Sequence, residues 1–336
     1  MSTTITIIPG DGIGPEIMTA TLRCLDALDC DFEYEFKQAG LVALDESGEL
    51  IPADTLESIR RNRIVLKGPL TTPVGQGFTS INVGLRKEFD LYANVRPVIS
   101  MPGTQSRFED IDIITVRENT QGAYLAEGSK ISEDGEKAES KMVVTRTGCA
   151  RIVHYAFDLA RSTGRKKVTI VHKANILKTV SGMFLDVARE VAAQYPDIEH
   201  DEMIVDAICM KLVMNPWQFD VIVTTNLFGD IISDLCAGLI GGLGLAPGAN
   251  IGEQAAMFEA VHGSAPDIAG EHIANPGALM LAAAQMLTHM GMDDRARKLR
   301  LAIRETIVAG DRTTPDLGGH GNTVSITDAI VERLLA

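Results

Sequence analysis

The sequence predicts an α/β protein, and two recurring hydrophobic patterns support this prediction. Short β-branched runs alternate with longer segments in which apolar residues recur at helical spacing, which is typical of strands that each lead into a helix. The C-terminal part of the chain is mainly of the helical kind. Strands are therefore expected at residues 4–8, 32–36, 64–66, 111–116, 167–172 and 220–225, and helices at residues 16–28, 53–61, 277–290, 295–309 and 326–335.

Length and charge limit the possible functions. A chain of 336 residues fits about two domains and needs no disulfides to bury a core. The net charge of −14 argues against nucleic acid or an anionic membrane surface as a partner. An uncharged stretch, residues 235–252, holds six glycines and a proline, which predicts packed loops rather than a membrane span.

The cysteines and the N-terminal segment indicate a cellular compartment. The five cysteines include no C-x-x-C pair, so neither a zinc cluster nor a disulfide framework is indicated, and a reducing compartment is expected. No signal-like or transit-like segment precedes the first predicted strand, which favours a cytoplasmic protein.

A glycine-rich loop follows the first predicted strand. Gly10, Gly12 and Gly14 lie between this strand and the next helix, as in a dinucleotide-binding fingerprint. The third glycine comes one residue too early for the G-x-G-x-x-G spacing, and Pro15 suits a first helical position. The loop therefore does not predict a Rossmann cofactor site.

A capped helix is predicted after Ser80, and it carries groups that suit a carboxylate. Asn82 and Arg86 are four residues apart and share a helical face just inside the N-terminus. A hydroxyl, an amide, a guanidinium and the free amides of a helix start would together bind an anionic group. An ordinary capped helix with a solvated arginine is the alternative.

Polar residues also follow two of the predicted strands. Arg117 comes directly after residues 111–116, with Tyr124 seven residues further on, and Lys173 comes directly after residues 167–172. Open α/β sheets place ligand contacts at strand ends, and a lysine held there can act as a base if its pKa is lowered. A packed tyrosine and a surface lysine are the alternatives.

Acidic residues indicate a metal site. Asp230 and Asp234 are four residues apart at the start of a predicted helix, where like charges repel unless a cation lies between them. With Asp206 they offer oxygen ligands, which favour Mg²⁺ or Mn²⁺ over zinc. Two acids that merely stabilise a helix N-terminus would give the same pattern.

Two segments interrupt the alternation of strands and helices. Residues 128–141 are charged at seven of fourteen positions and predict a surface excursion, either a dimerisation arm or a solvated hairpin. A polar, glycine-rich loop is expected over residues 259–275, and loops of this kind wrap nucleotides.

Taken together and in order, these motifs resemble the β-decarboxylating dehydrogenases, the family of isocitrate and 3-isopropylmalate dehydrogenases, along essentially the whole chain. The resemblance rests on K-G-P-L-T-T-P at residues 67–73, V-H-K-A-N at 171–175, N-L-F-G-D at 226–230 and H-G-S-A-P at 262–266. It implies a non-Rossmann α/β fold, with a large domain from residues 1–95 and 245–336 and a smaller dimerisation domain from residues 96–244. Residues 125–145 would then form a clasp in an obligate homodimer.

The resemblance also implies the site residues. Tyr124, Lys173 and Asp206 would be catalytic, with Lys173 and Asp206 reaching into the partner's active site and either of them acting as the initial base. Mg²⁺ or Mn²⁺ would be held by Asp206, Asp230 and Asp234. The substrate would contact Ser80, Asn82, Arg86, Arg96, Arg117, Tyr124, Lys173 and Asn175. NAD would contact Leu70, Thr72, Asn82, Glu259, His262, Gly263, Ser264, Ala265, Pro266, Asp267, Ile268 and Asn275.

Two features narrow the expected reaction. Ser80 and Asn82 are polar where isopropylmalate enzymes place apolar side chains, so the resemblance favours isocitrate, with homoisocitrate as the nearest competitor. Asp267 and Ile268 stand where NADP-dependent relatives carry lysine and tyrosine, and a carboxylate there repels a 2′-phosphate. We therefore expect NAD-dependent oxidative decarboxylation of isocitrate to 2-oxoglutarate in the tricarboxylic acid cycle. The alternatives are a homoisocitrate or 3-isopropylmalate dehydrogenase, or a non-catalytic regulatory subunit.

Overall fold

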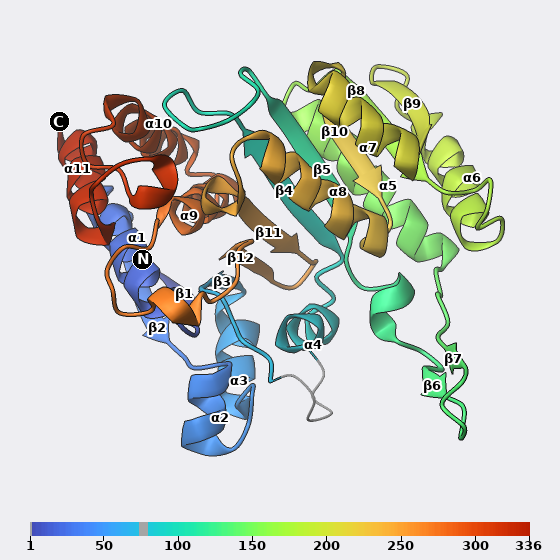
Figure 1. Ribbon diagram of the computed structural model, residues 1–336, viewed down its shortest axis with the longest axis horizontal. Helices are drawn as coiled ribbons and strands as arrows, with labels where there is room; N and C mark the ends of the chain where they lie inside the picture. The colour runs from blue at the N-terminus through green and yellow to red at the C-terminus, as the bar shows by residue number, and fades with distance from the viewer. Residues whose placement is uncertain (1, 74–79) are drawn as a thin grey trace.

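The computed structural model describes residues 2–73 and 80–336, which form two lobes on one mixed sheet (Figure 1). The strands of this sheet are β1 (Thr3–Ile8), β2 (Phe32–Phe36), β3 (Ile64–Lys67), β4 (Ala93–Ile99), β5 (Asp112–Glu118), β8 (Lys167–His172), β9 (Glu199–Ile204), β10 (Val221–Thr224), β11 (Pro247–Ile251) and β12 (Ala256–Ala260). Their order is β2-β1-β3-β12-β11-β4-β5-β10-β8-β9. β11 pairs antiparallel with β12 and β4, and β4 pairs antiparallel with β5, whereas the other neighbours are parallel.

Helices cover both faces of the sheet. They are α1 (Gly14–Ala27), α2 (Leu41–Ser47), α3 (Ala53–Asn62), α4 (Ile81–Glu88), α5 (Arg146–Ser162), α6 (Val180–Ala192), α7 (Val205–Met214), α8 (Asn226–Leu239), α9 (Gly277–His289), α10 (Asp293–Ala309) and α11 (Thr323–Leu335). Along β10, Val221 and Val223 belong to the same core cluster as α5 and α6, whereas Ile222 packs with α7 and α8. Because successive side chains of a strand point to opposite faces, a strand covered on both sides is apolar throughout.

The strand order brings the two ends of the chain together. β1, β2 and β3 lie beside β11 and β12, whereas β4, β5, β8, β9 and β10 form the other half of the sheet. We call the β11–β4 pair the seam, because it joins these two halves. The order differs from the 3-2-1-4-5-6 order of a Rossmann sheet, so the prediction of a non-Rossmann α/β fold is confirmed. The division into residues 1–95 with 245–336 and residues 96–244, whose first boundary falls inside β4, stays a prediction.

The charged excursion is a two-stranded hairpin that projects from the body of the protein (Figure 1). Its strands are β6 (Lys130–Ile131) and β7 (Ala138–Glu139), and they pair only with each other among the described residues. Ile131 is 72% exposed, which is unusual for an isoleucine in a strand. The role of the hairpin as a clasp stays a prediction.

Parts of the predicted secondary structure are wrong. Residues 235–252, expected as packed loops, contain the end of α8 and the buried central strand β11. This strand is built from small residues and lacks a β-branched pattern, so only its position in the sheet makes it a strand. β4, which contains Pro97, and the charged edge strand β9 were not expected either. The cysteines are free thiols as predicted, and no helix in residues 2–73 and 80–336 is long and apolar enough to cross a bilayer.

Candidate active site

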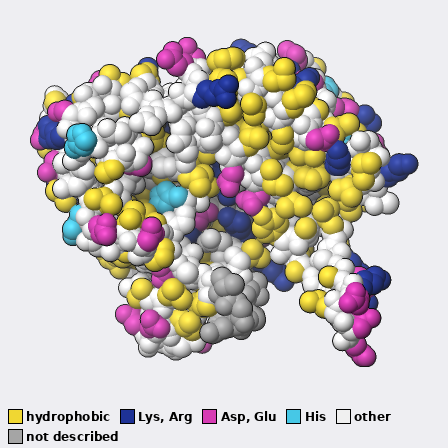
Figure 2. Space-filling model, viewed as in Figure 1, with side chains coloured by type: hydrophobic (Ala, Val, Ile, Leu, Met, Phe, Trp, Pro, Cys, Tyr) yellow, Lys and Arg dark blue, Asp and Glu magenta, His cyan; other side chains and the backbone are white. Residues whose placement is uncertain are grey.

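Three arginines from three elements lie close together. On the face of the molecule drawn in Figure 2, acidic and basic side chains lie side by side near the centre. Arg86 projects from α4, Arg96 from β4 and Arg117 from β5, and all three side chains are largely buried. Burial and the neighbouring guanidiniums of Arg96 and Arg86 lower the pKa of Arg117 to about 10. Burial and Arg86 also lower the pKa of Arg96. Three cations held this close together attract anions, so the predicted cluster is present and suits carboxylates.

The start of α8 fixes Arg117. Asn226 Oδ1 accepts hydrogen bonds from Arg117 Nε and Nη2 at 3.1 and 2.8 Å, and Asp230 pairs with Arg117 Nη1. A side chain at Gly229 would meet Arg117 Cγ at 2.5 Å, so the helix can pass this close only with glycine there. Asn226 is a functional residue that was not predicted from the sequence, although it opens the N-L-F-G-D segment.

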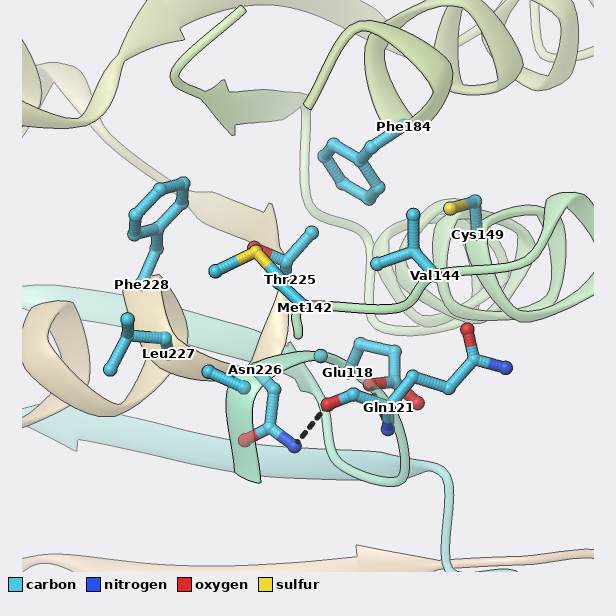
Figure 3. A pocket seen from close by; sticks show the side chains of 12 residues that line it. Glu118, Gln121, Met142, Val144, Cys149, Phe184, Thr225, Asn226, Leu227 and Phe228 are labelled. Atoms are coloured by element: carbon cyan, nitrogen blue, oxygen red, sulfur yellow. Dashed lines mark hydrogen bonds between the residues drawn. The ribbon is translucent and has the colours of Figure 1, made fainter. Parts of the chain in front are cut away.

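The amide of Asn226 is held on its other side as well. Its Nδ2 donates to the backbone carbonyl of Gln121 at 2.9 Å (Figure 3). Next to it lies a small hollow whose wall includes the apolar side chains of Val144, Phe184 and Phe228. Because both ends of the amide are bound, its oxygen stays directed at Arg117.

Two predicted metal ligands face the arginines. Asp234 Oδ1 accepts a hydrogen bond from Arg96 Nη1 at 3.1 Å, and Asp230 Oδ1 lies 3.7 Å from Arg96 Nη2. Burial opposes ionisation of Asp230, but Arg117 and Arg96 outweigh it and hold the pKa of this carboxyl below its usual range. Ser233, which was not predicted, accepts from Arg96 Nη1 at 2.8 Å. Its spacing of three residues from Asp230 places it on the same helix face and could have revealed it.

Tyr124 lies beside the same carboxylate. Its hydroxyl donates to Asp230 Oδ2, and the guanidinium of Arg117 lies 5.0 Å from the centre of its ring. Burial and the hydrogen bond to Asp230 raise the pKa of Tyr124. The tyrosine therefore keeps its proton near neutral pH and can donate it to a molecule bound at the arginines.

Lys173 and Asp206 lie apart from this group. They form an ion pair with each other, in which the Lys173 side chain is 24% and the Asp206 side chain 69% exposed. Among the described residues, neither forms an ion pair or hydrogen bond with Asp230, Asp234 or the three arginines. Asn175, further along the same loop, is exposed. One chain thus brings only part of the predicted site together.

The start of α4 is polar, but its cap differs from the prediction. Ser80 occupies the N-cap position, yet its side chain makes no capping hydrogen bond. Thr72 Oγ1 instead accepts from the backbone N–H of Ile81 at 3.1 Å, so a more distant loop caps the helix. Ser80 therefore stays exposed beside Asn82, with its hydroxyl free of the capping role that the sequence predicted.

The predicted cofactor loop lines a pocket of about 470 Å³. Its wall includes His262, Gly263, Ala265, Ile268 and Asn275, together with Asp316, which was not predicted. Asn275 is anchored there, because its Nδ2 donates to Asp316 at 2.9 Å and its Oδ1 accepts from the N–H of Gly277 at 2.8 Å.

Ser264 connects this loop to the N-terminal loops. Its hydroxyl lies 2.6 Å from that of Thr71, and its carbonyl accepts from the N–H of Ile13 at 2.9 Å. A Cβ at Gly12 would meet this carbonyl at 2.0 Å, so Gly12 permits the close approach of the loops. The N-terminal glycines thus support the pocket wall. Leu70 and Pro266 lie in the joined segments, and Asp267 is exposed.

Glu259 does not belong to the loop in which it was predicted. It lies in β12, is 6% exposed, and its Oε2 pairs with Lys67 Nζ at 2.7 Å. Burial opposes ionisation, but the charges of Lys67 and Arg86 outweigh it and lower the pKa of Glu259 to about 2. The prediction missed the strand because β12 is short and its pattern, A-M-F-E-A, is buried at every position.

The fit of a metal ion depends on the number of carboxylates that converge. Asp230 and Asp234 supply two oxygen ligands from one helix face, which suits Mg²⁺ or Mn²⁺. Within residues 2–73 and 80–336 of one chain, no three His, Cys, Asp or Glu side chains converge to hold a metal ion. Any third protein carboxylate would therefore have to come from outside the described part of this chain or from another chain.

An arginine cluster with adjacent carboxylates, a partly buried tyrosine, and a polar loop that lines a pocket are features of a protein that binds an anionic small molecule. The chain belongs to the isocitrate/isopropylmalate dehydrogenase family, which it matches over residues 4–332. The predicted family is therefore confirmed, and the family consists of dehydrogenases.

Relatives of two specificities are similarly close. The chain is 47% identical to catalytic subunit 5 of the mitochondrial NAD isocitrate dehydrogenase of Arabidopsis thaliana, over 98% of this chain and 88% of the relative. It is 48% identical to the 3-isopropylmalate dehydrogenase of Archaeoglobus fulgidus, over 98% and 99% of the two chains. The crystal structure of isocitrate dehydrogenase from Methylococcus capsulatus superposes with a TM-score of 0.97 at 55% identity and covers all of both chains.

Proposed function

We propose that the protein is an NAD-dependent isocitrate dehydrogenase that forms 2-oxoglutarate, CO₂ and NADH as a step of the tricarboxylic acid cycle. The observation that carries this proposal is the polar start of α4, where Ser80 and Asn82 share a helix with Arg86. An isopropyl group would leave these polar groups unpaired, whereas the additional carboxylate of isocitrate can accept hydrogen bonds from the Ser80 hydroxyl and the Asn82 amide.

Arg86, Arg96 and Arg117 would bind the substrate carboxylates. Their guanidiniums are local and largely buried, whereas most of the net charge of −14 lies on a surface that salt screens within about 8 to 10 Å. The acidic composition therefore does not prevent the binding of a tricarboxylate.

Asp230 and Asp234, with Asp206 of the partner subunit, would hold Mg²⁺ or Mn²⁺. When bound, this ion lowers the pKa of the substrate hydroxyl. Lys173 or Asp206 of the partner subunit would take the hydroxyl proton, directly or through water. Leu70 and Thr72 would help to hold the nicotinamide of NAD, which when bound would supply the hydride acceptor. After CO₂ leaves oxalosuccinate, Tyr124 with Lys173 would protonate the carbon that carried it.

The pocket at the cofactor loop would hold the adenosine part of NAD. The exposed Asp267 carboxylate can accept hydrogen bonds from ribose hydroxyls and repels a 2′-phosphate, which favours NAD over NADP. A homodimer in which the hairpin of β6 and β7 acts as a clasp, and a cytoplasmic location, complete the proposal. The Arabidopsis relative is mitochondrial, so the location needs its own test by fractionation of cells.

A single assay tests the proposed reaction. The purified chain is supplied with Mn²⁺, NAD or NADP, and one of isocitrate, homoisocitrate and 3-isopropylmalate. We expect kcat/KM to be highest for isocitrate with NAD. A higher value for either of the other acids or for NADP would contradict the corresponding part of the proposal, and no turnover of any acid would indicate a regulatory subunit.

A further inference from the structure

Buried amide side chains form a continuous hydrogen-bond network across the seam. Asn250 on β11 is 1% exposed, and its Nδ2 donates to Glu259 Oε1 at 2.7 Å. Its Oδ1 accepts from Asn94 Nδ2 and from Asn119 Nδ2, both at 2.9 Å. Asn250 and Asn94 are also directly paired residues of β11 and β4. Four polar side chains are therefore connected where the two halves of the sheet meet.

The direction of this network is fixed by chemistry. An ionised carboxylate only accepts hydrogen bonds, so Asn250 must direct its NH₂ group at Glu259. The amide oxygen of Asn250 then faces the other half of the sheet, and Asn94 and Asn119 must both donate to it. Removing Asn250 would break all three contacts at once.

Both ends of the network lead to the arginine cluster. Arg86 Nη2 lies 3.4 Å from Glu259 Oε1, the same oxygen that Asn250 binds. Asn94 is two residues from Arg96, and Asn119 is two residues from Arg117. Along β4, residues two apart point to the same face, and Asn94 is the direct antiparallel partner of Arg117 on β5, so the network lies on the face that carries these arginines.

The geometry points to Asn250 as a positioning residue for the arginine cluster. Lys67 holds Glu259 Oε2, and Asn250 holds Glu259 Oε1, so the carboxylate contacts Arg86 only at the longer distance of 3.4 Å. Without Asn250, Oε1 would be free to draw Arg86 into a closer ion pair. Arg86 would then be less available to a substrate carboxylate, and its guanidinium would be displaced from its position beside Arg96 and Arg117. This inference rests on the proposed role of the three arginines in binding substrate.

Asn250→Leu tests the inference, because leucine keeps the number and branching of the side-chain heavy atoms but removes every polar contact. We expect KM for isocitrate to rise about tenfold with kcat changed less than about threefold. Asn250→Ser keeps a donor and an acceptor and should give an intermediate KM. This variant also tests the inference if the leucine variant does not fold. Val95→Ala is the control, since Val95 is buried beside Asn94 but points to the other face. It should lower the melting temperature and leave KM unchanged.

A double-mutant cycle with Arg86→Gln decides whether Asn250 acts through Arg86. We expect Asn250→Leu to change KM less than about twofold when Arg86 is already replaced, because the two effects are coupled. Equal effects of Asn250→Leu in both backgrounds, or an unchanged KM in the single variant, would overturn the inference. The cycle uses whichever of the three acids the wild-type chain oxidises. A preference for 3-isopropylmalate would therefore contradict the proposed function and leave this test intact.

Discussion

Two parts of the predicted active site are organised differently. Within one chain, ion pairs and a hydrogen bond join Arg96, Arg117 and Tyr124 to Asp230, and Arg86 lies close enough to lower the pKa of both other arginines. The three arginine side chains are largely buried. Lys173 and Asp206 form a separate pair, and the Asp206 side chain is 69% exposed. An ion pair this exposed adds little stability, so stability does not explain its position. In the proposed homodimer, each chain would build the substrate-binding half of one site and present the proton-transfer half to its partner.

Lys173→Met removes the lysine of the exposed Lys173–Asp206 pair and should have the largest effect on kcat among these substitutions. Loss of a group that transfers protons typically costs about 10²–10⁴-fold, and we expect kcat with isocitrate to fall by about 10³-fold. Lys166→Met is the matched control, because Lys166 is exposed just before the opposite end of β8. Steady-state kinetics of both variants checks the prediction, which is wrong if the two substitutions have similar effects.

Tyr124→Phe changes the half that one chain organises by itself. The raised pKa of Tyr124 keeps its hydroxyl protonated, and we expect the loss of this donor to slow turnover of isocitrate by about 10²-fold. Reduction of added oxalosuccinate by NADH should suffer less than its decarboxylation.

Tyr155→Phe provides the comparison for Tyr124, since Tyr155 is a partly buried tyrosine on α5 that packs edge-on against Tyr92. If the Tyr124 variant reduces and decarboxylates oxalosuccinate equally well, Tyr124 does not have the assigned role.

Glu259→Gln tests how much the ionised carboxylate of Glu259, which lies beside Arg86, stabilises the fold. The pKa of Glu259 is lowered from 4.5 to about 2 in the folded protein, so its ionisation stabilises the fold above about pH 5. This contribution is lost as the pH falls towards 2 and amounts to on the order of 3 kcal/mol. The difference in unfolding free energy between wild type and Glu259→Gln should therefore shrink with falling pH.

Denaturant unfolding at pH values between 7 and 3 measures this difference. Glu253→Gln is the control, because Glu253 is exposed between β11 and β12. A difference that is independent of pH for Glu259→Gln would contradict the assigned pKa.

Substitutions in the cofactor loop should affect neither the arginine cluster nor the Lys173–Asp206 pair. We expect Asp267→Lys combined with Ile268→Tyr to reduce the preference for NAD over NADP by about tenfold, because a cation replaces the anion that repels a 2′-phosphate. KM for isocitrate should stay nearly constant. An unchanged ratio of kcat/KM for the two cofactors would show that other residues discriminate between NAD and NADP.

Local sequence patterns predicted the strands well where the run of apolar residues matches the observed burial. The strands at residues 4–8 and 167–172 were correctly placed because β-branched runs are buried on both faces there. β11 was missed because its sequence, P-G-A-N-I, lacks a β-branched pattern, and β12 was missed because it is short and buried at every position. The resemblance of the motifs to a known family supplied the non-Rossmann fold, which periodicity alone did not give.

The candidate site was predictable in its residue types and less so in its contacts. Arg96, Arg117, Asp230 and Asp234 do lie together. Strand ends and helix starts predicted functional roles for Arg117, Asp230 and Asp234, whereas the role of Arg96 came only from the resemblance to the family. The cap from Thr72 and the Asn250 network join residues that are distant in the sequence, so no local spacing could reveal them. Whether Lys173 and Asp206 complete the site stays a prediction, because it concerns contacts between chains.

Mixing two inactive variants tests the shared site most directly. Asp230→Asn damages the arginine half, and Lys173→Met damages the outward half. If each site combines one half from each subunit, a mixed dimer holds one intact site. Because random exchange gives mixed dimers about half the time, with one of two sites intact in each, unfolding and refolding the variants together should restore about a quarter of wild-type activity. Activity no higher than that of the separate variants would contradict the account.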